Sequence, residues 1–341
     1  MPPYALTMPA EWEPHDRTWM AWPPSGPTVA DLDEAGVLEV RRAWAAVALA
    51  VIEFEPVTMV VAPADLDSAR SLLDARIDVL VAPLDDAWMR DMGPTFVHDD
   101  AGAPMAVDWV FNGWGAQAWS TWGQDAQIAP IVATAAGVAT VPSPMVNEGG
   151  GIHVDGRGTV LVTETVQLDA DRNPGWSKAD VEAELARMLG VERVVWLRRG
   201  LTRDYEMFGT RGHVDIVAAF AGSDTILFHD QRNPAHPDFA VSAEVRATLA
   251  AAGSWRLLPV PAPEAVRDEE GWVDYSYINH YVVNGGVILC AFDDPQDDVA
   301  AAILQECYPD RRIVQVDARP IFARGGGIHC ITQQQPRTVR A

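Results

Sequence analysis

The chain has 341 residues, of which 48% are hydrophobic and 21% charged, and this composition excludes a disordered or fibrous protein. Asp and Glu total 48 against 25 Lys and Arg, so the formal net charge is −23. A charge of this sign opposes binding to nucleic acid or to an anionic membrane, and we expect neither as a partner.

Cysteine content and the N-terminal sequence indicate a cytoplasmic protein. Cys290, Cys307 and Cys330 are too few for a disulfide framework. The N-terminus lacks the basic region and apolar core of a secretory signal. The longest nearly apolar run, Ala43–Ile52, is too short to span a bilayer, so no transmembrane segment is expected.

In chain order, the first predicted element is an amphipathic helix over residues 34–54, where apolar residues recur at spacings of three or four: Val37, Val40, Trp44, Val47, Val51 and Phe54. Two β-branched runs follow, Val57–Ala62 and Ile77–Ala82, with a polar helical stretch between them. This segment therefore predicts a strand, a helix and a second strand.

The same alternation recurs along the rest of the chain. Ser177, with Asp180 three residues later, predicts the N-terminal cap of a helix that ends at Leu189. The further helices expected are Ser242–Ala252 and Asp297–Cys307, and the strands are Val141–Asn147, Arg193–Leu197, Ile216–Phe220, Thr225–Phe228, Trp255–Val260, Val287–Phe292 and Arg312–Val316. No linker divides these modules, so we predict a single α/β domain over residues 1–341.

An internal echo supports a pseudo-symmetric fold. The pentapeptide Gly-Gly-Gly-Ile-His occurs at residues 149–153 and again at residues 325–329. Both copies follow a β/α module and precede a strand-like segment. Repeated modules of this kind can present glycine-lined backbone to a common centre.

Cys330 is the first candidate for chemistry. It follows the second glycine run and precedes the polar segment 331–336, a loop-like setting that leaves a thiol accessible as a nucleophile. Cys290 lies inside a predicted strand, and Cys307 lies on the Val299, Ile303, Cys307 stripe of a predicted helix. Both are interpreted as core thiols.

Two His-x-Asp pairs each place an imidazole and a carboxylate on one face of an extended segment. His153 and Asp155 precede a Gly-Arg-Gly turn, which gives them a structural role at the end of a hairpin. His213 and Asp215 precede a buried-strand pattern and are favoured as functional residues. A mixture of these four groups also suits a metal ion, so a metal-dependent hydrolase remains an alternative.

Two carboxylates and a group of tryptophans complete the candidates. Glu148 precedes the first glycine run, where a loop projects it into a cleft, and Asp91 lies in the segment Trp88–Pro94. Five of the 13 tryptophans fall between residues 88 and 122. A subset of these rings can bind a flat cation, because the ring quadrupole attracts guanidinium and ammonium groups.

Together these segments resemble the agmatine deiminases, a branch of the guanidine-modifying pentein superfamily that includes bacterial peptidylarginine deiminases. The likeness covers nearly the whole chain. Its motifs are Met8–His15, Thr18–Pro23, Trp88–Pro94, Asn147–Gly156, Gly212–Asp215 and Ile328–Pro336.

The resemblance implies a fold and a set of site residues. The fold is a five-bladed pseudo-symmetric α/β propeller of ββαβ modules around a central active site. The implied nucleophile is Cys330, the acid/base is His213 with Glu148 as its partner, and the guanidinium-binding carboxylates are Asp91 and Asp215. Trp88 and Trp114 are expected beside the substrate.

The implied reaction is the hydrolysis of agmatine to N-carbamoylputrescine and ammonia through a covalent thioether on Cys330. The expected partner is a small cationic guanidino substrate, no metal or organic cofactor is expected, and a homodimer is left open. A catalytically silent binding protein on the same scaffold is the remaining alternative.

Four positions depart from the family pattern, namely Arg211, Ile216, Arg324 and Gly327. They flank the histidine and cysteine loops, where they bear on the substrate tail rather than on the reacting carbon. Arg211 is a possible counter-cation for a carboxylate, so another small guanidino compound that carries a carboxylate is the alternative substrate.

Overall fold

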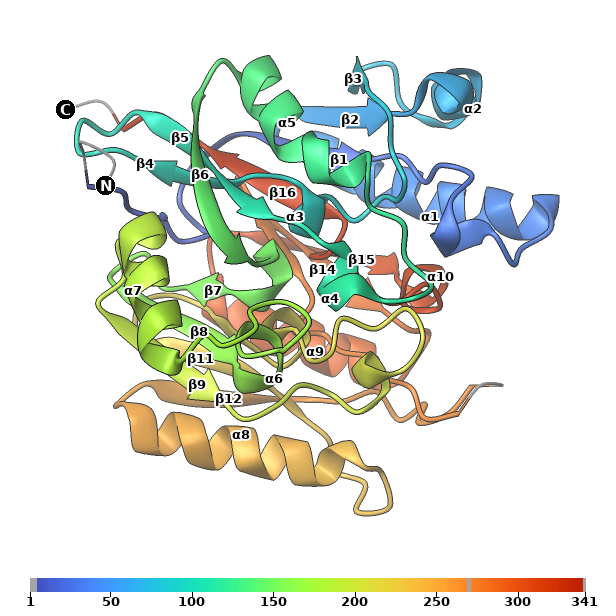
Figure 1. Ribbon diagram of the computed structural model, residues 1–341. Coiled ribbons are helices and arrows are strands. Elements are labelled where there is room, and N and C mark those ends of the chain that lie inside the picture. The colour runs from blue at the N-terminus through green and yellow to red at the C-terminus, as the bar shows by residue number, and fades with distance from the viewer. Residues whose placement is uncertain (1–4, 269–270, 340–341) are drawn as a thin grey trace.

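The computed structural model describes residues 5–268 and 271–339, which form five small β-sheets connected by helices (Figure 1). The first sheet orders its strands β16 (Thr332–Pro336), β1 (His15–Ala21), β2 (Val57–Val61) and β3 (Asp78–Val81). Each of the other four sheets has three strands. The second sheet contains β4 (Thr95–His98), β5 (Pro104–Val110) and β6 (Ala139–Val146), and the third contains β7 (His153–Val154), β8 (Thr159–Thr163) and β9 (Arg193–Leu197). The fourth contains β10 (Ala218–Phe220), β11 (Thr225–Asp230) and β12 (Arg256–Pro261), and the fifth contains β13 (Tyr281–Val283), β14 (Gly286–Ala291) and β15 (Arg312–Asp317).

Each sheet contains one antiparallel pair and then a parallel pair whose strands are joined through a helix, and the first sheet adds a second parallel pair, β2 with β3. Parallel neighbours require such a crossover, so the alternation seen in the sequence dictates this plan. The crossover helices are α1 (Glu34–Ile52), α5 (Ile128–Ala136), α7 (Lys178–Leu189), α8 (Asp238–Ala252) and α9 (Gln296–Cys307), and α2 (Leu66–Leu72) leads into β3. The predicted α/β class and the repeated ββαβ module are confirmed.

Local sequence signals set several element boundaries as predicted. In α7, Ser177 and Asp180 form the reciprocal capping box. Strand β9 has the predicted limits, Arg193–Leu197, and α1 buries Trp44 together with the other central residues of its predicted stripe. Helices such as α5, α7 and α8 lie on different sides of the molecule, outside the sheets (Figure 1).

Several predicted details of the helices and strands are wrong. Helix α9 buries Ala300 and Leu304 rather than the stripe through Val299, which is 43% exposed, because its inward face lies one position further on. Helix α8 begins four residues earlier than expected, at Asp238. The strand expected at residues 216–220 is shorter: Val214–Ile216 form a 3-10 turn, η6, and β10 begins at Ala218.

The polar segment after Cys330 is a buried strand, not a loop. Strand β16 pairs antiparallel with β1, so the two ends of the chain share one sheet. Its glutamines are buried because each finds a partner: Gln335 accepts a hydrogen bond from Trp19 Nε1 at 3.0 Å, and Gln334 accepts one from Arg90 at 2.7 Å. Within residues 5–268 and 271–339, no helix combines the length and apolarity that a bilayer crossing requires.

Candidate active site

The five connections that lead from one sheet to the next supply the candidate site. Each carries at least one polar residue that contributes to a single buried cluster, and the residues in chain order are Asp91, Glu148, His213 with Asp215, Asn279, and His329 with Cys330. All of them are at least nine-tenths buried. Residues far apart in sequence therefore meet because the modules repeat.

Asp91 lies in the short helix α3 (Met89–Met92), and two donors fix its carboxylate. Oδ1 accepts a hydrogen bond from the backbone N–H of Gly150 at 3.0 Å, and Oδ2 accepts one from Trp114 Nε1 at 2.9 Å. Trp114 has a φ of +57° between two glycines that also have positive φ, and this left-handed run turns its ring toward Asp91. Burial raises the pKa of Asp91 to about 6.

His213 and Glu148 form a buried ion pair. His213 Nε2 lies 3.3 Å from Glu148 Oε2, and Glu148 Oε1 accepts a hydrogen bond from Arg172 Nε at 2.9 Å. Although burial opposes a charged imidazole, the nearby carboxylates of Asp91 and Glu148 raise the pKa of His213 to about 9. Burial also opposes a charged Glu148, but Arg172 and His213 lower the pKa of that carboxyl to about 2. The imidazole is therefore held as a cation.

A buried carboxylate builds the loop that presents His213. Asp204 accepts hydrogen bonds from the backbone N–H groups of Thr210, Gly212 and His213. Gly212 has a φ of +112°, a conformation that favours glycine. The loop therefore places the imidazole by backbone geometry rather than by the extended strand predicted for residues 213–215.

Cys330 precedes β16, and its sulfur faces Asp215 and Asn279. Sγ lies 3.5 Å from Asp215 Oδ2, and Asn279 Nδ2 donates to it at 3.3 Å. The thiol is 5% exposed, so the accessible setting expected from its polar neighbours is wrong. Burial and the negative charges of Asp215 and Asp91 raise the pKa of Cys330 well above its usual range. Cys330 is therefore a thiol in this structure.

The polar groups converge on the space beside Gly150. A methyl group in place of one hydrogen of this glycine would lie 2.5 Å from His213 Nδ1, 3.0 Å from Asp91 Oδ1 and 3.1 Å from Asp215 Oδ2. His213 Nδ1, which faces this space, and Asp215 Oδ1, the other oxygen of that carboxylate, are buried without a hydrogen-bond partner. Unpaired buried polar atoms are costly, and several around one point indicate a site built for a polar ligand.

Aromatic rings extend from this cluster. Trp114 stacks on Trp119 at 5.3 Å between centroids, and Trp119 meets the edge of Phe208 at 5.3 Å. Trp88 lies close to Cys330, because a methyl group on Gly326 would contact both the Trp88 ring and Cys330 Sγ. The predicted tryptophans Trp88 and Trp114 therefore adjoin the catalytic candidates.

Both arginines that depart from the family pattern are paired with carboxylates. Arg211 Nη1 lies 2.8 Å from Asp169 Oδ2 and 2.9 Å from Asp171 Oδ2. Arg324 Nη1 lies 2.8 Å from Asp31 Oδ1. The other two departures are packing positions, since Ile216 is buried in the core and Gly327 packs against Asn279.

The two His-x-Asp pairs have different surroundings in the structure. Asp155 Oδ1 accepts hydrogen bonds from the backbone N–H groups of Arg157 and Thr159, as the hairpin interpretation predicted. His153 Nδ1 accepts a hydrogen bond from the backbone N–H of Phe220. In the described part of the chain, the group with metal-like spacing is Glu11, His153 and His329, not the four residues of the metal-hydrolase alternative.

Sequence reasoning did not single out the residues that support the cluster. Asn279 comes from the fourth sheet-to-sheet connection, in the segment Ser-Tyr-Ile-Asn-His. Its signal is a single amide between Ile278 and His280, which is weak in one sequence. Arg172 and Glu11 are likewise charged residues whose partners lie far away along the chain.

A model of the Porphyromonas-type peptidyl-arginine deiminase family matches residues 7–336. The chain belongs to this family. A protein of Streptomyces coelicolor is 57% identical over 97% of this chain and 99% of its own length. An agmatine deiminase of Pseudomonas aeruginosa is 39% identical over 98% of this chain and 96% of that enzyme.

Solved structures agree with this family membership. The agmatine deiminase of Enterococcus faecalis superposes with a TM-score of 0.91 at 32% identity, covering 98% of this chain and 97% of that one. An agmatine deiminase of Campylobacter jejuni superposes with a TM-score of 0.88 at 20% identity. This match supports the fold alone.

Proposed function

We propose that this protein is an agmatine deiminase, which hydrolyses agmatine to N-carbamoylputrescine and ammonia. The observation that carries the proposal is the set of groups around Gly150, where His213 Nδ1, Asp91 Oδ1 and Asp215 Oδ2 face one space. Two atoms of these side chains, His213 Nδ1 and Asp215 Oδ1, are buried without a hydrogen-bond partner. Carboxylates in such a space are suited to a planar guanidinium, because each can accept hydrogen bonds from its N–H groups.

The substrate cation activates the nucleophile in this proposal. In the free site, burial together with the charges of Asp215 and Asp91 keeps the pKa of Cys330 high. A guanidinium bound between these carboxylates neutralises their field and lowers the free energy of the thiolate. Asn279 Nδ2, which already donates to Sγ, stabilises that thiolate. The nucleophile therefore forms when its substrate is in place.

The covalent steps use one proton shuttle. The Cys330 thiolate attacks the guanidinium carbon, and His213 donates a proton from Nδ1 to the departing nitrogen, which leaves as ammonia. The neutral imidazole then takes a proton from a water molecule that attacks the same carbon. Collapse of that adduct, with its hydroxyl proton passing to the departing sulfur, releases the neutral ureido product and the Cys330 thiol. The proton that the thiol lost at the start of the cycle leaves with ammonia as ammonium. Glu148, itself bound by Arg172, holds the imidazole throughout.

Charge at the outer part of the site favours agmatine over a carboxylate-bearing guanidino compound. Arg211 and Arg324 are each engaged by aspartates, so neither is an uncompensated partner for a substrate carboxylate. Burying an unpaired carboxylate costs several kcal/mol, and arginine carries one where agmatine does not. The aromatic rings Trp88, Trp114 and Trp119 are suited to a cationic alkyl tail.

The five ββαβ modules form a five-bladed propeller in this proposal, and residues 1–341 form one domain. The arrangement of the site supports it, because each sheet-to-sheet connection contributes to the same cluster. A cytoplasmic location fits the cysteine content, since a nucleophilic thiol is kept reduced there.

A panel of guanidino compounds scored by ammonia release tests the function. We expect kcat/KM for agmatine to exceed that for arginine and 4-guanidinobutyrate by about 100-fold or more, because each carboxylate loses its hydration on binding. A preference for either carboxylate compound that disappears in Arg211→Asn would contradict agmatine as substrate. Activity abolished by a chelator would instead favour the metal-hydrolase alternative.

A further inference from the structure

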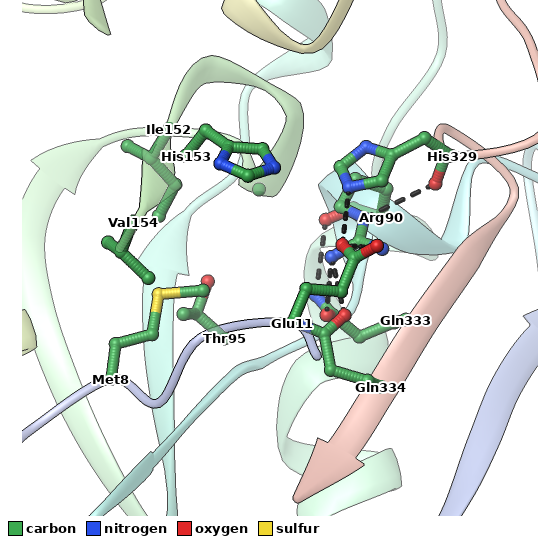
Figure 2. A pocket seen from close by; sticks show the side chains of 11 residues that line it. Met8, Glu11, Arg90, Thr95, Ile152, His153, Val154, His329, Gln333 and Gln334 are labelled. Atoms are coloured by element: carbon green, nitrogen blue, oxygen red, sulfur yellow. Dashed lines mark hydrogen bonds and ion pairs between the residues drawn. The ribbon is translucent and has the colours of Figure 1, made fainter. Parts of the chain in front are cut away.

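A second polar cluster, centred on Glu11, adjoins the proposed guanidinium site. Oε2 of Glu11 lies 2.8 Å from His329 Nε2 and 3.5 Å from Arg90 Nη2, and Oε1 accepts a hydrogen bond from the backbone N–H of Val282 at 2.8 Å. Figure 2 shows Glu11 directed at His329, with His153 across the cavity. These side chains are all buried.

His329 connects the cluster around Glu11 to Asp215. Its Nδ1 lies 2.7 Å from Asp215 Oδ2, while its Nε2 is held by Glu11. The imidazole thus donates to two carboxylates at once. Oδ2, the oxygen that His329 holds, also borders the space beside Gly150, and Oδ1 of the same carboxylate is buried without a hydrogen-bond partner.

The backbone of His329 is fixed as firmly as its ring. Its N–H donates to Asn279 Oδ1 at 3.0 Å, and its carbonyl accepts a hydrogen bond from Arg90 Nε at 3.2 Å. Arg90 directly precedes Asp91, and its own N–H donates to the carbonyl of Cys330. The cluster therefore ties together the segments that carry Asp91, Asp215 and the nucleophile.

The same residues do not form a metal site. The backbone N–H of Phe220 donates to His153 Nδ1, so the proton of the neutral ring is on Nε2, which then has no lone pair for a metal. Burial lowers the pKa of His153 to about 3, which keeps the ring neutral. Arg90 also shares the Glu11 carboxylate. The enclosed space is about 10 Å³, enough for one water molecule.

We propose that His329 is a positioning residue, clamped by Glu11, that holds Asp215 with one carboxylate oxygen free for the substrate guanidinium. This inference rests on the proposed function only for its kinetic readout. His329 does not contact the reacting carbon and acts through Asp215.

Two substitutions of similar size separate the two bonds of His329. The side-chain amide of His329→Asn reaches about as far as Nδ1 and keeps a donor for Asp215, whereas that of His329→Gln reaches about as far as Nε2 and keeps a donor for Glu11. We expect His329→Asn to retain kcat/KM for agmatine within about 10-fold and His329→Gln to lose about 100-fold, with a larger part of the loss in KM.

A double-mutant cycle checks that His329 acts through Asp215. We expect His329→Gln to lower the residual activity of Asp215→Asn by less than about 3-fold, because the residue it positions is already impaired. Full multiplication of the two losses would overturn the proposal, as would equal losses in His329→Asn and His329→Gln.

Crystal structures of the two substrate-free variants test the inference without any turnover. Asp215 should keep its side-chain conformation in His329→Asn and rotate or shift in His329→Gln, and an unmoved Asp215 in both would overturn the proposal. If the wild-type protein releases no ammonia from agmatine, the proposed function fails, and these two structures still decide the role of His329.

Discussion

The two copies of Gly-Gly-Gly-Ile-His have the same sequence, but the pKa values of their histidines are shifted in opposite directions. In the first copy, burial lowers the pKa of His153 to about 3, and its ring accepts a hydrogen bond from a backbone N–H. In the second copy, His329 lies between Glu11 and Asp215, which raise its pKa despite burial. Identical pentapeptides thus supply a neutral packing residue in one place and a cation in the other, and the neighbours decide which.

The glycines of the two copies also serve different partners. Gly150 of the first copy lies against His213, Asp91 and Asp215, whereas Gly326 of the second lies against Trp88 and Cys330. Each copy brings backbone close to the site, as the sequence predicted. The first copy lines the proposed guanidinium site, and the second leads directly into the proposed nucleophile, Cys330.

The largest expected effect comes from the residue that follows the second copy. Cys330→Ser should lower ammonia release from agmatine by about 1000-fold or more, because a serine hydroxyl is a far weaker nucleophile at neutral pH. Cys307→Ser, in α9, is the matched control and should stay near wild-type activity. Substantial turnover by Cys330→Ser would contradict the prediction that Cys330 is the nucleophile.

The next effect sharpens the role of the first copy. Gly150→Ala should lower kcat/KM by about 100-fold or more, because its methyl group would occupy the space that three catalytic groups face. The neighbouring Gly151→Ala meets only side-chain atoms at 3.2 Å and beyond, so its loss should be much smaller. Steady-state kinetics of the two variants would contradict the site if Gly151→Ala were the worse enzyme.

The two His-x-Asp pairs provide a third comparison. Asp215→Asn should cost about 100-fold in kcat/KM, since a charge-assisted contact to the guanidinium is lost. Asp155→Asn keeps a carbonyl oxygen for the two backbone donors of its turn and should retain nearly full activity. Equal losses in both variants would show that the second pair has no special function.

The pH dependence of kcat/KM should be bell-shaped. Below a pH of about 6, protonation of Asp91 removes a guanidinium ligand, and above a pH of about 9, His213 loses the proton that it donates, given the pKa values of these two groups. Glu148→Gln should move the alkaline limb to lower pH, because the lost carboxylate no longer raises the pKa of His213. An alkaline limb unchanged in this variant would contradict the pairing.

The smallest effect concerns stability rather than activity. His153 has a lower pKa in the folded protein than its ordinary 6.5, so the unfolded chain binds its proton first and stability falls as the pH drops below about 6.5. Between pH 7 and pH 5 this loss amounts to about 2 kcal/mol. Urea unfolding of His153→Asn, which keeps an acceptor for the Phe220 N–H, should show a correspondingly smaller loss.

Much of the architecture was predictable because it depends on local patterns. Helix α1 follows from its apolar periodicity, α7 from its capping box, and β9 from a short β-branched run. The errors fall where tertiary contacts override such patterns. Strand β16 is polar in sequence and buried in the fold, because Trp19 and Arg90 lie where they can donate to its glutamines.

The sequence by itself determined the α/β class, the repeated module and, through the family motifs, the five catalytic candidates that the fold then brings together. Only the tertiary structure decided the protonation states and the supporting residues. A pKa depends on burial and on charges within a few ångströms, and Glu11, Arg172 and Asn279 reach their partners from distant connections. Such proximity is not encoded in any local pattern. The sequence alone therefore could not show which of the two identical pentapeptides carries the neutral histidine and which carries the charged one.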